Sequence, residues 1–259
     1  MRYMGGKHRQ SKDIVRVLKD RHGFGFKYCE PFCGSMSSAV KVMKELSPSH
    51  VRLSDINRPL IKLWAGLVSG SIDLPRFITD QEYNMYKKTR DMEDPMTAWF
   101  GIAVSFGGKW FGGLAHHFGG LARHSREKLD RYDFAPQVNS TMKKVEVLRR
   151  FAPDIQESDY HEATKNLRGW VIYLDPPYEG RTKAHCFHSF DTEIFWSRVR
   201  ELSMNNDVYI SAFDCPNDFE IVHEWGNTVV GHHAAKPKDS TSEKLVTWTK
   251  NLTSKCHRR

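Results

Sequence analysis

The chain has 259 residues, of which 39% are hydrophobic and 27% are charged; this composition is that of an ordinary globular protein with one large domain, or one domain carrying a smaller insert. It excludes a disordered chain, and no apolar run reaches the roughly 18–20 residues of a membrane helix. The N-terminus lacks the apolar segment of a secretory signal, and the five cysteines are scattered. We therefore expect a cytoplasmic protein without disulfides or a metal site.

Positive charge is concentrated in particular segments of the chain, whose net charge is +8. Residues 1–27 carry eight Lys and Arg against two Asp and Glu, and residues 76–150 carry thirteen against nine, whereas residues 151–230 carry six against fourteen. Basic segments of this kind suit a phosphate backbone. Solvated lysines and arginines would give the same pattern, so charge alone does not establish a nucleic-acid partner.

Helices and strands are predicted to alternate through the first 70 residues. Apolar residues at helical spacing predict helices over residues 10–20, 35–46 and 59–67, and short β-prone runs predict strands over residues 27–30 and 51–54. Such alternation is typical of a parallel sheet whose strands are joined by crossover helices.

Residues 72–150 are rich in glycine, aromatic and basic residues, which predicts a mainly helical insert. The alternation resumes afterwards with an apolar strand at residues 170–174, buried on both faces. The remaining expected elements are a helix at 192–204 capped by Asp191 or Thr192, a strand at 208–213, a short helix at 217–225 and an antiparallel hairpin of residues 228–232 and 244–248. The predicted fold is α/β, with one domain formed by residues 1–71 and 151–259 around the insert.

Asp175, Pro176, Pro177 and Tyr178 directly follow the buried strand. Ligands of open α/β sheets bind beyond the carboxyl ends of the strands, so we expect this loop to face a crevice. The prolines stiffen the loop and remove two backbone donors, and an ionised carboxylate only accepts hydrogen bonds. The Asp175 side chain and the Pro176 carbonyl would thus form a rigid pair of acceptors for an amino group on a planar ring, with Tyr178 stacked on that ring.

This pair of acceptors, the Asp175 carboxylate and the Pro176 carbonyl, is called the clamp below, and it would prepare an amine for methylation. The lone pair of an amino nitrogen on a nucleobase is delocalised into the ring, which makes the nitrogen a poor nucleophile. Two acceptors that hold both of its hydrogens favour a pyramidal nitrogen, and its lone pair then points at an electrophile held in line. No metal is expected in this scheme.

The order of the motifs resembles that of the Dam-type DNA adenine-N6 methyltransferases, which use S-adenosylmethionine (SAM). The resemblance spans nearly the whole chain. It rests on the Gly-aromatic insert, a final strand hairpin and four short motifs: Tyr3-Met-Gly-Gly-Lys7, Glu30-Pro-Phe-Cys-Gly34, Ser54-Asp55-Ile56-Asn57 and Asp175-Pro-Pro-Tyr178. It implies a Rossmann-like class I methyltransferase sheet that is mixed because of its C-terminal hairpin. It further implies target recognition by the insert and catalysis by Asp175, Pro176, Pro177 and Tyr178.

The resemblance also implies a set of cofactor-binding residues. A glycine after the first strand lets the backbone approach the methionine part closely, and an acid at the end of the second strand suits the ribose hydroxyls. The full set is Tyr3, Lys7, Glu30, Phe32, Gly34, Asp55, Ile56, Asp159 and Asp175. The chain departs from the family at Gly34-Ser35-Met36, where a richer glycine cluster is usual.

Double-stranded DNA is the partner that the resemblance implies, and the target base must leave the duplex because its amine is otherwise paired and stacked. The candidate DNA-binding residues are Lys109, Arg123, Arg126, Lys128, Arg181 and Lys183. The sequence does not reveal the recognition site, or whether the context is restriction–modification or a phage. A monomer is the default expectation.

Two alternatives stay open at this stage. Cytosine N4 presents a similar amino group, and the aspartate of the tetrapeptide favours adenine without proving it. A catalytically inactive DNA-binding protein of the same fold is the second alternative, and the reduced glycine cluster is its only support.

Overall fold

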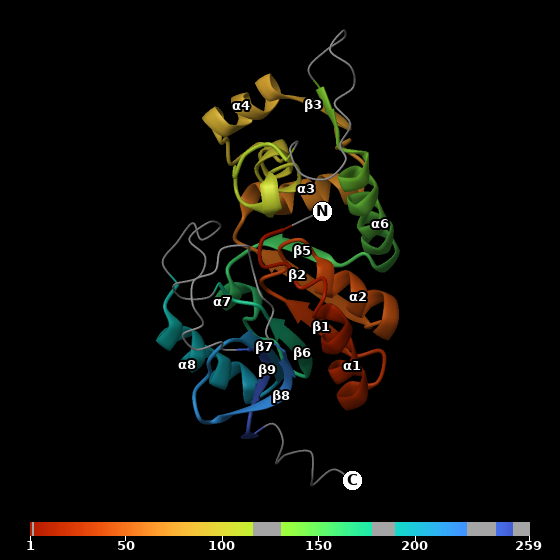
Figure 1. The fold of residues 1–259 in the computed structure, drawn as a ribbon. Coiled ribbons are helices and arrows are strands. Elements are labelled where there is room, and N and C mark those ends of the chain that lie inside the picture. The colour runs from red at the N-terminus through yellow and green to blue at the C-terminus, as the bar shows by residue number, and fades with distance from the viewer. Residues whose placement is uncertain (2, 116–130, 178–189, 227–241, 251–259) are drawn as a thin grey trace.

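A computed structural model describes residues 1, 3–115, 131–177, 190–226 and 242–250 (Figure 1). Its central element is a seven-stranded sheet in the order β5-β2-β1-β6-β7-β9-β8. The strands are β1 (Lys27–Glu30), β2 (His50–Asp55), β5 (Asp154–Glu157), β6 (Trp170–Leu174), β7 (Asp207–Ala212), β8 (Phe219–Trp225) and β9 (Glu243–Trp248).

The sheet is parallel from β5 to β7, and β9 runs antiparallel to both β7 and β8. From β1 the chain proceeds outward through β2 to β5, then crosses back to β6 on the other side of β1 and continues to β7. The strand order therefore reverses between β1 and β6, and such a reversal opens a crevice beyond the carboxyl ends of the two strands. This topology confirms the predicted Rossmann-like mixed sheet.

Helices cover both faces of the sheet (Figure 1). The helices that pack on the sheet or on one another around it are α1 (Ser11–His22), α2 (Ser37–Leu46), α3 (Arg58–Ser69), α6 (Ala135–Phe151), α7 (Tyr160–Ala163) and α8 (Thr192–Ser203). The α1, α2 and α8 helices lie where helical spacing predicts them, and the Asp191 side chain caps α8 by accepting from the Ile194 N–H at 2.9 Å. Within the described chain, no helix has both the length and the apolar character that crossing a membrane requires.

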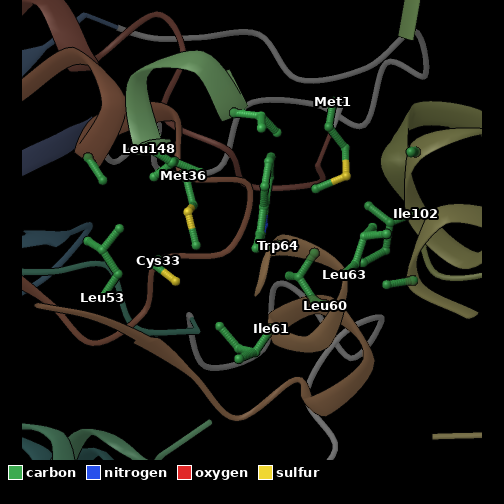
Figure 2. Close-up of a cluster of buried hydrophobic side chains, with 14 of the residues drawn as sticks. Met1, Cys33, Met36, Leu53, Leu60, Ile61, Leu63, Trp64, Ile102 and Leu148 are labelled. Atoms are coloured by element: carbon green, nitrogen blue, oxygen red, sulfur yellow. The ribbon is translucent and has the colours of Figure 1, made fainter. Parts of the chain in front are cut away.

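Alternate residues of the central strands supply two separate cores. Tyr28 and Tyr173 face the core beneath α1, α2 and α3, whereas Cys29 and Ile172 face the core beneath α8. This two-sided burial explains why β6 is an uninterrupted apolar run. Figure 2 shows part of the first core, where Trp64 of α3 lies among Met36 just before α2, Leu148 of α6 and Met1.

The region predicted as an insert is mainly helical in its described part and also contains a short antiparallel pair, β3 with β4, which was not predicted. Its elements before α6 are β3 (Phe77–Thr79), α4 (Asp80–Thr89), α5 (Met96–Ala98), a π-helix (Trp99–Ala103), a 3-10 turn (Phe106–Gly108) and β4 (Arg131–Asp133). Figure 1 places α4 and β3 at the end of the molecule away from β7, β8 and β9. By contrast α6 packs against α2 and α3.

Two predictions of secondary structure were wrong. Residues 219–225 form the edge strand β8 rather than a helix; a bulge between Ile221 and His223 interrupts its alternation, so its apolar residues imitate helical spacing. The predicted C-terminal hairpin exists, but β8 is its first strand, while residues 228–232 lie outside the described chain. The polar edge strand β5 was not predicted from the sequence.

Candidate functional site

A cavity of about 490 Å³ opens where the strand order reverses, at the carboxyl ends of β1 and β6. Residues from six parts of the sequence line it: the N-terminal segment, the loops after β1, β2 and β6, and the starts of α7 and α8. The predicted site residues that line it are Tyr3, Lys7, Glu30, Phe32, Gly34, Asp55, Ile56, Asp159, Asp175, Pro176 and Pro177. The fold thus brings these residues to one place, while their individual roles remain predictions.

Asp175 is held by an ion pair at the end of β6. The Lys7 Nζ lies 2.7 Å from the Asp175 Oδ1 and 3.1 Å from the Glu243 Oε1 at the start of β9. It also donates to the Gly5 carbonyl at 3.1 Å. Burial of Lys7 opposes its charge, but the two carboxylates outweigh this and raise the pKa of the ammonium. An ammonium at this distance favours the ionised, hydrogen-bond-accepting form of Asp175.

Glu30, at the end of β1, is buried beneath the cavity. Its carboxyl accepts hydrogen bonds from the Tyr28 hydroxyl at 2.6 Å and from the Ser38 hydroxyl. Burial raises the pKa of Glu30 to about 8, although these two hydrogen bonds oppose the rise. Lys144 of α6 lies nearby and donates to the Ser35 carbonyl at 2.6 Å and to the Ser37 hydroxyl at 2.8 Å. Burial lowers the pKa of Lys144 to about 8.

These two groups predict a stability profile with opposite slopes on the two sides of pH 8. Between about pH 4.5 and 8 the native Glu30 keeps a proton that the unfolded chain loses, so stability falls as pH rises, by at most about 1.4 kcal/mol per pH unit. Between about pH 8 and 10.5 the unfolded Lys144 keeps the proton that the native state loses, and this contribution rises with pH. Urea unfolding from pH 5 to 10 measures both slopes.

Glu30→Gln, which imitates the protonated carboxyl, should remove the falling slope and leave the rising one. Lys144→Met should do the reverse and serves as the matched control. A wild-type slope below pH 8 that survives in Glu30→Gln would show that Glu30 does not hold the proton.

The loop after β1 is shaped by contacts from two other elements. Gly34 has φ +43°, and a Cβ there would lie 3.2 Å from the Tyr3 ring, so the position favours glycine. Its N–H donates to the Asp55 Oδ2 at 2.9 Å and its carbonyl accepts from the Trp64 Nε1 at 3.1 Å. Burial raises the pKa of Asp55, although the N–H groups of Asn57 and Gly34 oppose this. Gly34 therefore suits its own position, whereas Met36, in the same reduced glycine cluster, adopts a positive φ of 57° without being glycine.

Aromatic rings form one wall of the cavity. Phe32 and Tyr160 stack with centroids 5.4 Å apart and planes inclined by 27°, and Phe190 meets the Phe32 ring edge-on at 6.3 Å. The neighbouring Asp159 caps α7, because its Oδ1 accepts from the His161 N–H at 2.7 Å and the Glu162 N–H at 3.0 Å. Ile56, on the loop after β2, lines the cavity and is 41% exposed.

Of the predicted DNA-binding residues the structure describes Lys109, which is exposed and does not line the cavity. It follows Gly108, whose carbonyl accepts from the Met4 N–H at 3.2 Å, and Met4 itself lines the cavity. The remaining predicted residues that lie outside the described chain are Tyr178, Arg123, Arg126, Lys128, Arg181 and Lys183.

Two charged residues near the site were missed from the sequence. Glu243 begins a strand whose position in the sheet depends on pairing with β7, and no local motif marks it. Lys144 lies in the segment assigned to the insert, yet α6 packs on α2 and reaches the loop after β1. Among the described residues, His, Cys, Asp and Glu side chains nowhere gather in a group of three that could hold a metal ion.

Several solved structures are similar to this chain. The rRNA methyltransferase aviRa from Streptomyces viridochromogenes is 14% identical with a TM-score of 0.45, over 97% of this chain and 89% of that one. Magnesium protoporphyrin IX methyltransferase from Synechocystis, solved with bound SAM, is 9% identical with a TM-score of 0.37 (93% and 79%). A ribosomal protein L11 methylase from Lactobacillus delbrueckii is 9% identical with a TM-score of 0.38 (93% and 79%). Among curated protein sequences there is no significant match.

The sequence itself matches a family model over most of its length. Residues 3–95 and 125–250 match the D12 class N6 adenine-specific DNA methyltransferases. The two matched segments include the N-terminal lysine motif, both acidic strand ends and the Asp175-Pro-Pro loop, all of which meet at the cavity. The match favours neither cytosine methylation nor an inactive decoy. The chain therefore belongs to the D12 class of N6 adenine-specific DNA methyltransferases.

Proposed function

We propose that the cavity binds SAM and that the loop after β6 holds the N6 amine of an adenine extruded from double-stranded DNA. The observation that carries this proposal is that Asp175 and Pro176 line the same cavity as Phe32, Gly34 and Asp55. The predicted amine acceptors and the predicted cofactor residues are thus neighbours, as a direct transfer between the two ligands requires.

The lining of the cavity fits SAM in size and charge. A volume of about 490 Å³ is within the usual range for cofactor sites. Among the charged side chains of the lining, carboxyl groups outnumber the Lys7 ammonium; they belong to Glu30, Asp55, Asp159, Asp175 and Asp191. This acidic lining complements a ligand that carries a sulfonium and an ammonium group. When bound, SAM would supply an electrophilic methyl group.

The chain's own residues would hold both reactants. Asp55 would accept hydrogen bonds from the ribose hydroxyls, and the ring of Phe32 or Tyr160 would cover the cofactor's adenine. Asp175 and the Pro176 carbonyl would accept the two hydrogens of the target amine. The ion pair with Lys7 leaves Asp175 able to accept further hydrogen bonds, because the two oxygens of its carboxylate offer about four acceptor sites.

DNA would be held by the insert, residues 72–150, and by the segment that follows the catalytic loop. Lys109 supports this assignment in two ways. Its side chain is exposed, and the residue before it, Gly108, accepts a hydrogen bond from the backbone N–H of Met4, which lines the cavity. The proposal extends to Arg123, Arg126, Lys128, Arg181 and Lys183, which supply positive charge for phosphates. Tyr178 is proposed to stack on the extruded base.

The proposal is tested by incubating the protein with unmethylated plasmid and SAM. The DNA is then digested to nucleosides, which are identified by mass spectrometry. N6-methyldeoxyadenosine is the expected product, and treatment with EDTA is expected to leave its amount unchanged. N4-methyldeoxycytidine would overturn the assignment of the clamp to adenine. A protein that neither binds SAM in a titration nor modifies DNA would overturn the proposal as a whole.

A further inference from the structure

We propose that Glu243, the first residue of β9, is a positioning residue that fixes the Lys7 ammonium against the Asp175 carboxylate. The inference rests on the proposed function, because it takes Asp175 to be the acceptor of the target amine. It assigns a part in methyl transfer to a residue of the C-terminal antiparallel strand that is not among the site residues predicted from the sequence.

The geometry of Lys7 is that of a fully satisfied, buried ammonium. The residue is 5% exposed. An ammonium has three N–H donors, and among the described residues three acceptors lie around the Nζ: Asp175 Oδ1 at 2.7 Å, Glu243 Oε1 at 3.1 Å and the Gly5 carbonyl at 3.1 Å. Each acceptor comes from a different part of the chain. The position of the Nζ is therefore determined by all three together rather than by Asp175 alone.

Glu243 is itself fixed. Its Oε2 accepts a hydrogen bond from the Gln10 side chain at 3.0 Å, just before α1, and the residue is buried. Its backbone is held by β8, where Trp225 is its partner in the strand register. The Glu243 carboxylate is therefore a rigid anchor, whereas the long lysine stem would otherwise leave Lys7 several rotamers.

The anchor matters for the reaction because Lys7 lies directly against the catalytic loop. A carboxylate that swings away from its ammonium would no longer present its oxygens to an amine in a constant direction. Since misplacement of a catalytic group by about 1 Å can cost 10²-fold in rate, we expect the loss of Glu243 to slow methyl transfer more than it weakens cofactor binding.

The charges around Lys7 also predict a pH signature. The titratable groups that face this ion-pair cluster are Asp175 after β6, Glu243 on β9, Tyr173 on β6 and Glu30 on β1. Asp175 and Glu243 raise the pKa of Lys7 against the effect of burial. Without the Glu243 charge the ammonium loses its proton at a lower pH, so the alkaline loss of activity moves to lower pH.

The test compares Glu243→Gln with wild type in single-turnover methylation of a DNA duplex that contains the target adenine in unmethylated form. We expect the transfer rate constant to fall by about 10- to 100-fold, the Kd for SAM to change by less than about threefold, and the alkaline limb of the pH–rate profile to move to lower pH. Glu220→Gln is the matched control, because Glu220 lies on the same hairpin, is exposed and is not near Lys7; its rate should equal that of wild type.

A double-mutant cycle separates positioning from general stability. In a Lys7→Met background the change Glu243→Gln should alter the rate by less than about twofold, because the partner it fixes has been removed. The inference fails if Glu243→Gln keeps the wild-type rate and pH profile, or if it loses SAM affinity and transfer rate in equal measure. An active Asp175→Ala variant would refute the proposed function itself, whereas an inactive Asp175→Ala together with an unaffected Glu243→Gln would refute this inference alone.

Discussion

Replacing Asp175 with alanine is expected to slow methyl transfer to adenine by about 10³-fold, the size of effect seen when a charge-bearing hydrogen-bond partner of the reacting group is lost. The Kd for SAM should change by less than about fivefold, because the other residues that line the cavity stay in place. The fold should survive, since Lys7 keeps its ion pair with Glu243 at 3.1 Å. Single-turnover rates and a SAM titration on the same preparation measure both quantities.

Asp214→Ala is the matched control for this variant. Asp214 is an exposed aspartate in the loop after β7, the strand next to β6, and it does not line the cavity. Its loss should leave rate and affinity at their wild-type values. Transfer by Asp175→Ala within about tenfold of wild type would show that the clamp is not the source of the catalysis.

Replacing Trp64 with alanine is expected to cost about 3–5 kcal/mol of unfolding free energy, because its side chain is fully buried in the core beneath α3. Trp64→Phe keeps much of the volume but removes the indole N–H that binds the Gly34 carbonyl at 3.1 Å, and should cost about 1–3 kcal/mol. Trp64→Phe should also raise the Kd for SAM, since the loop at Gly34 lines the cavity. Urea unfolding and a SAM titration measure the two effects.

Trp99→Phe is the control that separates the effect of losing the Trp64–Gly34 hydrogen bond from the effect of losing an indole ring. Trp99 is equally buried, but within the described residues its Nε1 has no hydrogen-bond partner. Its replacement should cost less than that of Trp64 and leave the Kd for SAM unchanged. Equal effects of the two substitutions would mean that the Trp64–Gly34 hydrogen bond contributes nothing.

The parts of the site that local patterns determine could be predicted from the sequence. The apolar run of residues 170–174 is typical of a strand buried on both faces, which places the residues after it at a carboxyl end of the sheet. Asp55 could be placed for the same reason, because it closes the second strand. The crevice follows from the parallel topology, which the alternation of helices and strands already implies.

Features that depend on contacts between distant residues could not be predicted. Glu243 meets Lys7 only because β9 pairs with β7, and nothing near residue 243 signals that register. Lys144 reaches the loop after β1 through the packing of α6 on α2. The edge strands β5 and β8 were missed because edge strands are half-solvated, so their hydrophobic pattern is weak or interrupted.

The place of β9 in the sheet has a consequence for how the molecule is made. It follows all the other described strands in the chain, yet it lies between β7 and β8 rather than at an edge. During synthesis on the ribosome, β8 emerges without a strand to pair with, and β7 keeps an open side until β9 arrives. A ribosome stalled before residue 243 would therefore display an incomplete sheet, which limited proteolysis of arrested nascent chains should detect as cleavage within residues 219–225.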